Sequence, residues 1–283
     1  DELRLLRDEG VEGIPVSGET LSLLRRRRKT AVAPEKPRAE SPAASPPKAE
    51  TTPAEKEDGE EALGPPPVIN LPEGPREEQY RFLLETLRND AVCLRNLNPG
   101  KKPVLGVGNL EADIFFCGEA PGAEEETQGE PFVGPAGQLL TKMIEAMGLG
   151  RKSVYIGNIM NWRPRTGKAY GNRPPTGDEM AYCLPYLRAQ LEIVAPKVIV
   201  ALGGTAAAGL LGIDTKGKMG KLRGSWLSFA DTPVIVTFHP SFLLHQGTVA
   251  RKREVWEDLL AVMEKTGLPI SEKQRRYFLA AGR

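Results

Sequence analysis

Four short runs of apolar residues, dense in β-branched and aromatic side chains, constrain the fold of this chain most strongly. They are nearly continuous rather than alternating, and they cover residues 112–117, 154–160, 197–202 and 233–238. Strands of this kind are typical of a parallel sheet that is covered on both faces. We therefore predict a three-layer α/β/α sandwich with a central parallel sheet of about four strands.

The segments between these runs have helical spacing. Thr176 and Glu179 have the spacing of a capping box, which marks the start of a helix. The expected helices cover residues 137–147, 176–194, 205–211 and 251–263, and a leading helix covers 78–97. Strands and helices thus alternate along the chain.

The sequence divides into three parts. Residues 1–29 contain two short amphipathic pieces and end in a basic run, Arg25 to Lys29. Residues 30–77 are rich in Ala, Pro, Glu, Ser and Lys, and such a stretch buries too little surface to offset the entropy of ordering, so we expect a disordered linker. Residues 78–283 form the predicted domain. The basic run fits either loose DNA contact by counterion release or a helix end that binds an unknown partner.

Composition excludes several settings. Lys and Arg number 38 and Asp and Glu 37, so net charge gives no sign of a nucleic-acid partner. Three cysteines make no disulfide framework, which favours a reducing cytoplasm. The chain has no run long enough to span a bilayer and no signal-peptide pattern at its start, so we expect a cytoplasmic protein without a membrane partner. We also expect a monomer.

Polar residues and glycines follow the apolar runs. The carboxyl ends of the predicted strands carry Glu119, Asn158, Gly203-Gly204 and His239. Ligands of open α/β sheets bind beyond these ends. Glu119 and His239 could be ordinary loop residues, but the chain has only one other histidine, His245, and the position favours a site.

An ordered set of motifs connects these residues. The set comprises Gly118-Glu119-Ala120-Pro121-Gly122, Pro131 to Leu140, Tyr155-Ile156-Gly157-Asn158, Arg163-Pro164 with Asn172-Arg173-Pro174, Leu202 to Ala207 and His239-Pro240-Ser241. In order and spacing the set resembles the family 4 uracil-DNA glycosylases. The resemblance covers roughly residues 92–263 and leaves residues 1–77 unexplained.

The resemblance implies an enzyme that hydrolyses the N-glycosidic bond of deoxyuridine in DNA and so initiates base excision repair. The transition state of this hydrolysis has a cationic sugar and an anionic uracil, so catalysis is mostly electrostatic stabilisation of these charges. By resemblance, Glu119 orients water or stabilises the sugar, and His239 donates to a uracil carbonyl oxygen. Uracil-containing DNA is the implied partner.

The resemblance also implies binding roles. Asn158 offers a donor and an acceptor to the uracil edge, and Phe132 stacks on the flipped base. The base pocket is further lined by Ala120, Pro121 and Glu125, the last beside C5, where it excludes the methyl group of thymine. DNA contacts fall to Gly203, Gly204, Ser241, Leu243 and Arg251.

Each of these residues has a plainer interpretation. Phe132 could be core, Asn158 a strand-end amide, the glycine pair a tight turn, and Arg251 part of a solvated helix start. Two other functions also stay open: a DNA- or uracil-binding protein with little or no turnover, and a glycosylase for another deaminated base such as hypoxanthine.

The cysteines depart from the family pattern. Family 4 enzymes usually hold an iron–sulfur cluster on four cysteines. Here only Cys183 and Cys93 match ligand positions, while Asp90 and Trp162 stand at the other two. We therefore predict no cluster and no other metal, with Trp162 filling the space. The segment 165–171 lengthens a loop and could contact DNA or be a surface insertion.

Overall fold

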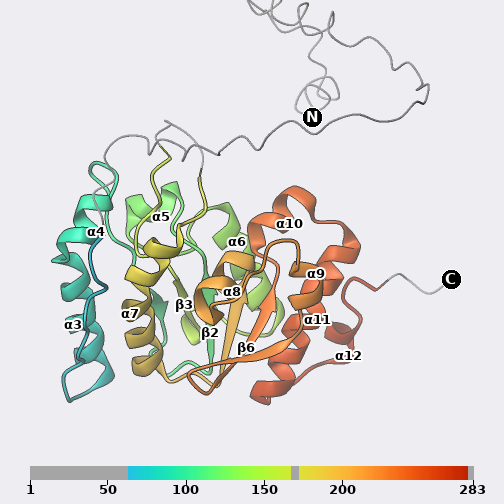
Figure 1. Ribbon diagram of the computed structural model, residues 1–283. Helices are drawn as coiled ribbons and strands as arrows, with labels where there is room; N and C mark the ends of the chain where they lie inside the picture. Colours follow the sequence, from blue (N-terminus) through green and yellow to red (C-terminus); the bar gives the residue numbers. More distant parts are fainter. Residues whose placement is uncertain (1–62, 167–171, 280–283) are drawn as a thin grey trace, which may run out of the picture. The chain divides into compact units, whose positions relative to one another are not determined.

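The computed structural model describes residues 63–166 and 172–279, and its centre is one mixed sheet (Figure 1). In this part of the chain the sheet has six strands in the order β1-β3-β2-β4-β6-β5. The four inner strands are mutually parallel, which confirms the predicted parallel core. They are β3 (Tyr155–Asn158), β2 (Ile114–Gly118), β4 (Val198–Leu202) and β6 (Thr232–Thr237).

Two antiparallel strands that the sequence does not predict close the edges of the sheet. β1 (Val107–Gly108) pairs with β3, and β5 (Trp226–Phe229) pairs with β6. β1 has only two residues, and the first three residues of β5 are exposed, so neither resembles a buried strand. Edge strands of this kind lie outside what an apolar run can indicate.

Helices cover both faces of the sheet. Successive strand residues point to opposite sides, so each face of the sheet presents apolar side chains to the helices that cover it. Val200 packs in the cluster that includes α6 and α11, while its neighbour Ile199 packs with α7 and α8. The sandwich is therefore confirmed. The longer helices are α3 (Arg76–Arg88), α6 (Pro135–Ala146), α7 (Gly177–Val194), α8 (Gly204–Leu211) and α11 (Val249–Thr266). The shorter ones are α4 (Ala91–Asn96), α5 (Ala123–Gln128), η1 (Arg151–Ser153), α9 (Met219–Leu222), α10 (Pro240–Gln246) and α12 (Glu272–Arg275).

The predicted capping box opens α7. The Thr176 hydroxyl accepts from the Glu179 N–H at 3.2 Å, and the Glu179 carboxylate accepts from the Thr176 N–H at 2.7 Å. The same carboxylate pairs with both terminal nitrogens of Arg173 at 2.7 and 2.8 Å. The start of α7 is thus fixed to the loop that precedes it.

The predicted leading helix over 78–97 is two helices, α3 and α4, and the break lies at Asn89 and Asp90. The Asp90 carboxylate caps α4 by accepting from the Val92 N–H at 2.8 Å and the Cys93 N–H at 3.0 Å. It also accepts from the hydroxyls of two tyrosines in α7, Tyr182 at 3.0 Å and Tyr186 at 2.7 Å. One carboxylate therefore starts α4 and fastens it to α7.

The described chain begins inside the segment that composition assigns to a linker. Leu63, Ile69 and Leu71 are partly buried against the cluster formed by α3, α4 and α7. The ordered domain therefore begins before residue 78, where the sequence predicts its start. The predicted helical segment 1–29 and residues 30–62 lie outside the described residues. No helix among residues 63–166 and 172–279 is long and apolar enough to cross a membrane.

Replacing Asp90 by Ala should lower the free energy of unfolding by about 3 kcal/mol in urea titrations. About 1 kcal/mol comes from the lost cap, and ~1 kcal/mol comes from each tyrosine hydroxyl that loses its acceptor. Asn89→Ala, at the exposed end of α3, serves as the control and should change stability by less than about 0.5 kcal/mol. An Asp90→Ala value as small as the control would contradict this account of how α4 is held.

Candidate active site

The carboxyl ends of the four parallel strands bring the candidate residues to one edge of the sheet. Gly118 is in register with Asn158, and Leu202 is in register with Thr237. Glu119, Gly203 and His239 follow these strands directly or within two residues. The register therefore places the carboxylate, the amide and the imidazole at the same edge of the sheet.

Asn158 and Phe132 share the space beside Gly118. A Cβ atom at position 118 would lie 2.4 Å from Oδ1 of Asn158 and 2.5 Å from Cζ of Phe132, so any residue larger than glycine would displace these side chains. Asn158 is 5% exposed, and its Oδ1 has no hydrogen-bond partner in the described part of the chain. A buried carbonyl oxygen without a donor is costly unless something else supplies one. The geometry therefore marks Oδ1 as a position for a ligand donor.

Phe132 lies beside the imidazole of His239. Their ring centroids are 5.7 Å apart and the planes are tilted by 33°. Phe132 has a φ of +54°, and its side chain is 6% exposed. Phe132 was expected either to stack on a base or to be a core residue. The two interpretations are compatible, because the ring packs in the core and also borders Asn158 and His239.

Glu125 is buried in α5 and holds the loop that carries Phe132. Its Oε1 accepts from the N–H groups of Val133 at 3.1 Å and Gly134 at 3.0 Å. Its Oε2 lies close to Gly122, where a Cβ atom would be only 2.5 Å away. The carboxylate is therefore engaged with backbone, and its predicted place beside C5 of a base stays a prediction. Pro121 is buried and Ala120 half-buried next to it.

His239 is the N-cap of α10 and is bonded on one ring nitrogen. Nδ1 accepts from the Ser241 N–H at 3.2 Å and lies 2.7 Å from the Ser241 hydroxyl. A backbone N–H can only donate, so Nδ1 carries no proton and the neutral ring has its hydrogen on Nε2. Burial lowers the pKa of His239 to about 4, against the opposing charge of Glu125. The imidazole is therefore a neutral donor through Nε2 at neutral pH.

Glu119 is half-buried at the end of β2. Burial raises the pKa of its carboxyl group above the ordinary value, while a hydrogen bond from the Thr205 hydroxyl lowers it. Thr205 lies in the first turn of α8, directly after the glycine pair. Thr205 belongs to the motif Leu202 to Ala207, but the motif alone does not predict this contact. The one feature of the sequence that indicates a role for Thr205 is its position, three residues after the end of β4.

The predicted DNA-contacting residues lie around α8, α10 and α11. Gly203 has a φ of +95° and a Cβ there would touch His239 at 3.1 Å, so it lets the chain turn beside the imidazole. Its N–H donates to the Thr237 carbonyl at 2.8 Å, so this amide is engaged within the protein. Gly204 begins α8. Arg251 pairs with Glu254 at 2.7 Å and rests over the ring of Phe238.

One predicted contact needs correction. Leu243, one of the expected DNA contacts, is 7% exposed and belongs to the core cluster that includes α6 and α11, so almost none of its side chain is available to DNA. The next residue, Leu244, is 47% exposed on α10. The sequence Phe242-Leu243-Leu244 alone does not show which of the two leucines faces inward, because the helix is only seven residues long.

The residues at the family's cluster positions do not fit four-thiolate ligation. Cys93 and Cys183 are free and fully buried, and burial raises the pKa of the Cys93 thiol to about 12. Trp162 is 1% exposed and packs 6.0 Å, centroid to centroid, from Tyr182. Asp90 is committed to its cap and the tyrosines. Within the described ranges, no group of three or more His, Cys, Asp or Glu side chains is arranged to hold a metal ion.

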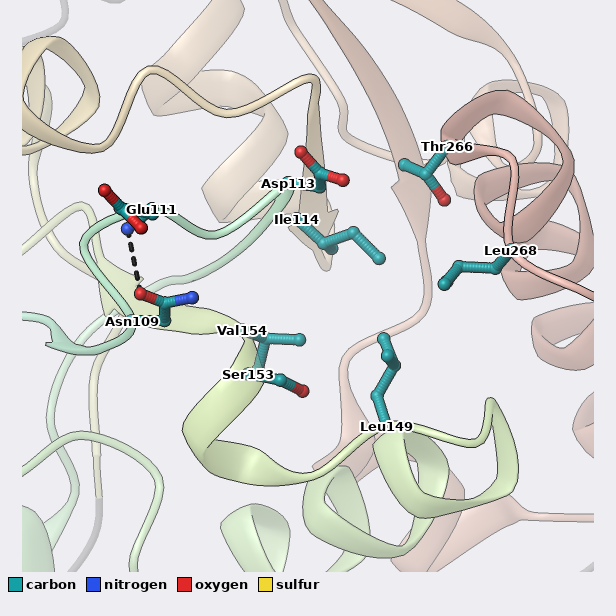
Figure 2. A pocket seen from close by; sticks show the side chains of 9 residues that line it. All are labelled: Asn109, Glu111, Asp113, Ile114, Leu149, Ser153, Val154, Thr266 and Leu268. Atoms are coloured by element: carbon teal, nitrogen blue, oxygen red, sulfur yellow. Dashed lines mark hydrogen bonds between the residues drawn. The ribbon is translucent and has the colours of Figure 1, made fainter.

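A hollow of about 220 Å³ lies at the opposite end of the sheet (Figure 2). Asp113, Ile114, Ser153 and Val154 line it just before or at the start of β2 and β3, so it opens at the amino ends of these strands. It is smaller than the ~300–1,000 Å³ of ordinary ligand pockets. Because it lies at the amino ends of the strands, the hollow is separate from the site at their carboxyl ends.

Comparison with known proteins identifies the family. Residues 105–260 match the model of the uracil DNA glycosylase superfamily. The chain belongs to this superfamily. It is 42% identical over 187 residues to a type-4 uracil-DNA glycosylase of Thermotoga maritima, which covers 65% of this chain and 93% of the relative. The type-4 enzyme of Archaeoglobus fulgidus is 40% identical over 160 residues, 53% of this chain and 76% of the relative.

A more distant relative also matches. A type-5 uracil-DNA glycosylase of Pyrobaculum aerophilum is 28% identical over 189 residues, 62% of this chain and 79% of the relative. The superfamily match contains all of the candidate site residues, from Glu119 to Arg251. The edge of the sheet described above therefore lies within the part of the chain that matches the superfamily.

Proposed function

We propose that this protein is a uracil-DNA glycosylase that hydrolyses the N-glycosidic bond of deoxyuridine in DNA, leaves an abasic site and so initiates base excision repair. The proposal is supported by type-4 uracil-DNA glycosylases that are 36–42% identical to the chain. The observation that carries it is the buried Oδ1 of Asn158, which lacks a partner among the described residues beside Phe132 and His239.

Asn158 supplies the recognition of the base. Its Oδ1 accepts from N3–H of uracil and its amide nitrogen donates to O4. Cytosine reverses this pattern, so it leaves buried polar groups unpaired and is rejected. The ring of Phe132 stacks on the flipped base, with Ala120 and Pro121 lining the pocket and Glu125 beside C5. The flipped base thus meets a surface that is complementary before it arrives.

His239 and Glu119 stabilise the two charges that develop as the bond breaks. Neutral His239 donates through Nε2 to a carbonyl oxygen of uracil as negative charge accumulates there. The Glu119 carboxylate faces the cationic sugar and orients the attacking water. Fixed groups that need no reorganisation are the main source of such catalysis. Because the imidazole of His239 is already neutral, it donates a hydrogen bond without adding a positive charge to the site.

DNA is held by groups around α8, α10 and α11. Ser241 orients His239 and contacts the DNA backbone. The amide of Gly204, at the start of α8, faces a DNA phosphate, and Arg251 contacts DNA from the start of α11. Gly203 contributes the turn. The exposed Leu244 wedges into the base stack, which offsets part of the cost of flipping. A cytoplasmic location fits three cysteines that are all free and buried, and the proposal takes the protein as a monomer.

The proposal includes no iron–sulfur cluster. Asp90 and Trp162 fill two ligand positions with a capping carboxylate and a packed ring, and the chemistry above needs no iron. Protein purified without oxygen from iron-supplemented cells should contain less than about 0.1 iron per chain, since a cluster needs its thiolate ligands. The matched comparison is the Asp90→Cys, Trp162→Cys double variant, which has four cysteines at these positions. Stoichiometric iron in the unmodified protein would refute this part.

Uracil excision should depend on both Glu119 and His239, which stabilise the charges of the transition state. With an end-labelled oligonucleotide containing one uracil and no divalent metal, Glu119→Gln and His239→Gln should each lower the single-turnover rate by about 10²–10³-fold. Asn158→Ala should lower it comparably for uracil. Matched controls are Glu124→Gln and His245→Gln, exposed residues of the same types, which should keep the wild-type rate.

Other outcomes separate the alternatives. Uracil-dependent binding without cleavage by the wild-type protein would favour a binding protein. Cleavage of hypoxanthine in preference to uracil would favour a glycosylase for another deaminated base. Wild-type rates in both Glu119→Gln and His239→Gln would contradict the proposed site.

The pH dependence should report Glu119. The carboxylate must be charged, so kcat/KM should fall as pH drops through its raised pKa, while His239, with a pKa of about 4, stays neutral over most of that range. Because the Thr205 hydroxyl stabilises the charged form, Thr205→Val should move the acid limb to higher pH and leave the plateau nearly unchanged. Thr266→Val, at the far end of the sheet, is the control. An acid limb that does not move would contradict the contact.

A further inference from the structure

Phe132 holds a backbone conformation that an aromatic residue seldom adopts. Its φ of +54° lies in the left-handed region, where Cβ crowds the following carbonyl group. Strain of this kind persists only where neighbouring groups fix the backbone, and it is often associated with functional sites. The question is therefore what holds this loop.

Two charged side chains hold the backbone on either side of Phe132. Before it, Nη2 of Arg151 donates to the carbonyl oxygen of Pro131. After it, the Glu125 carboxylate accepts from the N–H groups of Val133 and Gly134 at 3.1 and 3.0 Å. Charge-assisted hydrogen bonds are stronger than neutral ones, so the two ends of the turn are fixed more firmly than in an ordinary loop.

Arg151 reaches this loop from η1, and its guanidinium is placed there at a cost. Its Nη1 is buried without a hydrogen-bond partner in the described chain. Burial lowers the pKa of the guanidinium, and the carboxylates of Glu130 and Glu125 oppose this effect. A partly buried charge with one unpaired nitrogen lowers the stability of the fold, so stability alone does not explain the position of Arg151.

Close contacts restrict the loop further. A Cβ atom at Gly137 would lie 1.8 Å from the Phe132 carbonyl oxygen, so the first turn of α6 rests directly on this backbone. On the other side the ring lies against Gly118. The backbone of Phe132 thus lies against α6 and its ring against Gly118, while Arg151 and Glu125 bind the residues on either side.

We infer that Arg151 is a positioning residue which acts through Phe132. Together with Glu125 it forms a clamp that keeps the ring in the place where it stacks on the base, before any substrate binds. This rests on the proposed function and adds to it a residue that contacts neither base nor sugar. Groups fixed in the productive geometry avoid the loss of rate that a shift of about 1 Å causes.

Single-turnover excision of uracil from DNA tests the clamp in the full chain. Arg151→Met should lower the rate by about 10-fold or more, and Arg151→Lys should fall between Met and wild type, because lysine keeps the charge but not the planar guanidinium. Lys152→Met, the exposed neighbour, should match wild type. The Kd for DNA with an abasic site, which offers no base to stack, should stay within about 2-fold of wild type.

A double-mutant cycle separates positioning from a merely structural role. If Arg151 acts through Phe132, then adding Arg151→Met to Phe132→Ala should change the rate by less than about 2-fold. A full, additive loss in the Phe132→Ala background would overturn the inference, as would a wild-type rate in Arg151→Met. If the Met variant does not fold, the same cycle is run with Arg151→Lys.

A crystal structure of the Arg151 variant keeps the two proposals distinguishable. If wild-type protein excises no uracil, the proposed function fails. The clamp is then decided by the variant's structure: a Phe132 that leaves its left-handed conformation supports it, and one that keeps φ near +54° with the ring against Gly118 overturns it.

Discussion

A parallel sheet that is buried on both faces can present polar side chains only where its strands end, and this constraint organises the molecule. Every residue of β2 and β4 is buried, so a polar group within them would lose its hydration without a partner. Glu119, Asn158 and His239 lie at or just beyond the carboxyl ends, where a bound ligand can supply the partner that Oδ1 of Asn158 lacks among the described residues. Because the strands are in register, the three groups reach a common edge. The helices that follow each strand supply the remaining walls of the site.

Burial at this edge then sets the charge of each group. It lowers the pKa of His239 to about 4 and raises that of Glu119, in both cases by disfavouring the charged form. The imidazole is thereby neutral, and the Ser241 N–H selects the tautomer with its hydrogen on Nε2. For the carboxylate, the Thr205 hydroxyl offsets part of the burial effect. Charge, tautomer and ring position are all fixed by protein groups before substrate enters.

The sequence predicts most of this arrangement, and its failures have physical causes. Apolar runs predict buried strands well, and the capping box predicts the start of α7. The strand β1 is too short to have a pattern, and the helix break at Asp90 is visible only as one capping residue within a continuous helical period. The inward face of α10, which buries Leu243, depends on how a short helix packs. The contact of Arg151 with the Pro131 carbonyl joins side chain to backbone across the fold, which no local pattern indicates.

The most direct test of the central claim is a crystal structure of the protein with free uracil. The account predicts that uracil stacks on Phe132, with N3–H donating to Oδ1 of Asn158 and a carbonyl oxygen accepting from Nε2 of His239. The Phe132 loop should be unchanged from the uracil-free structure, because the pocket exists before the base arrives. Uracil bound elsewhere, or an Asn158 amide bonded within the protein while uracil is present, would contradict it.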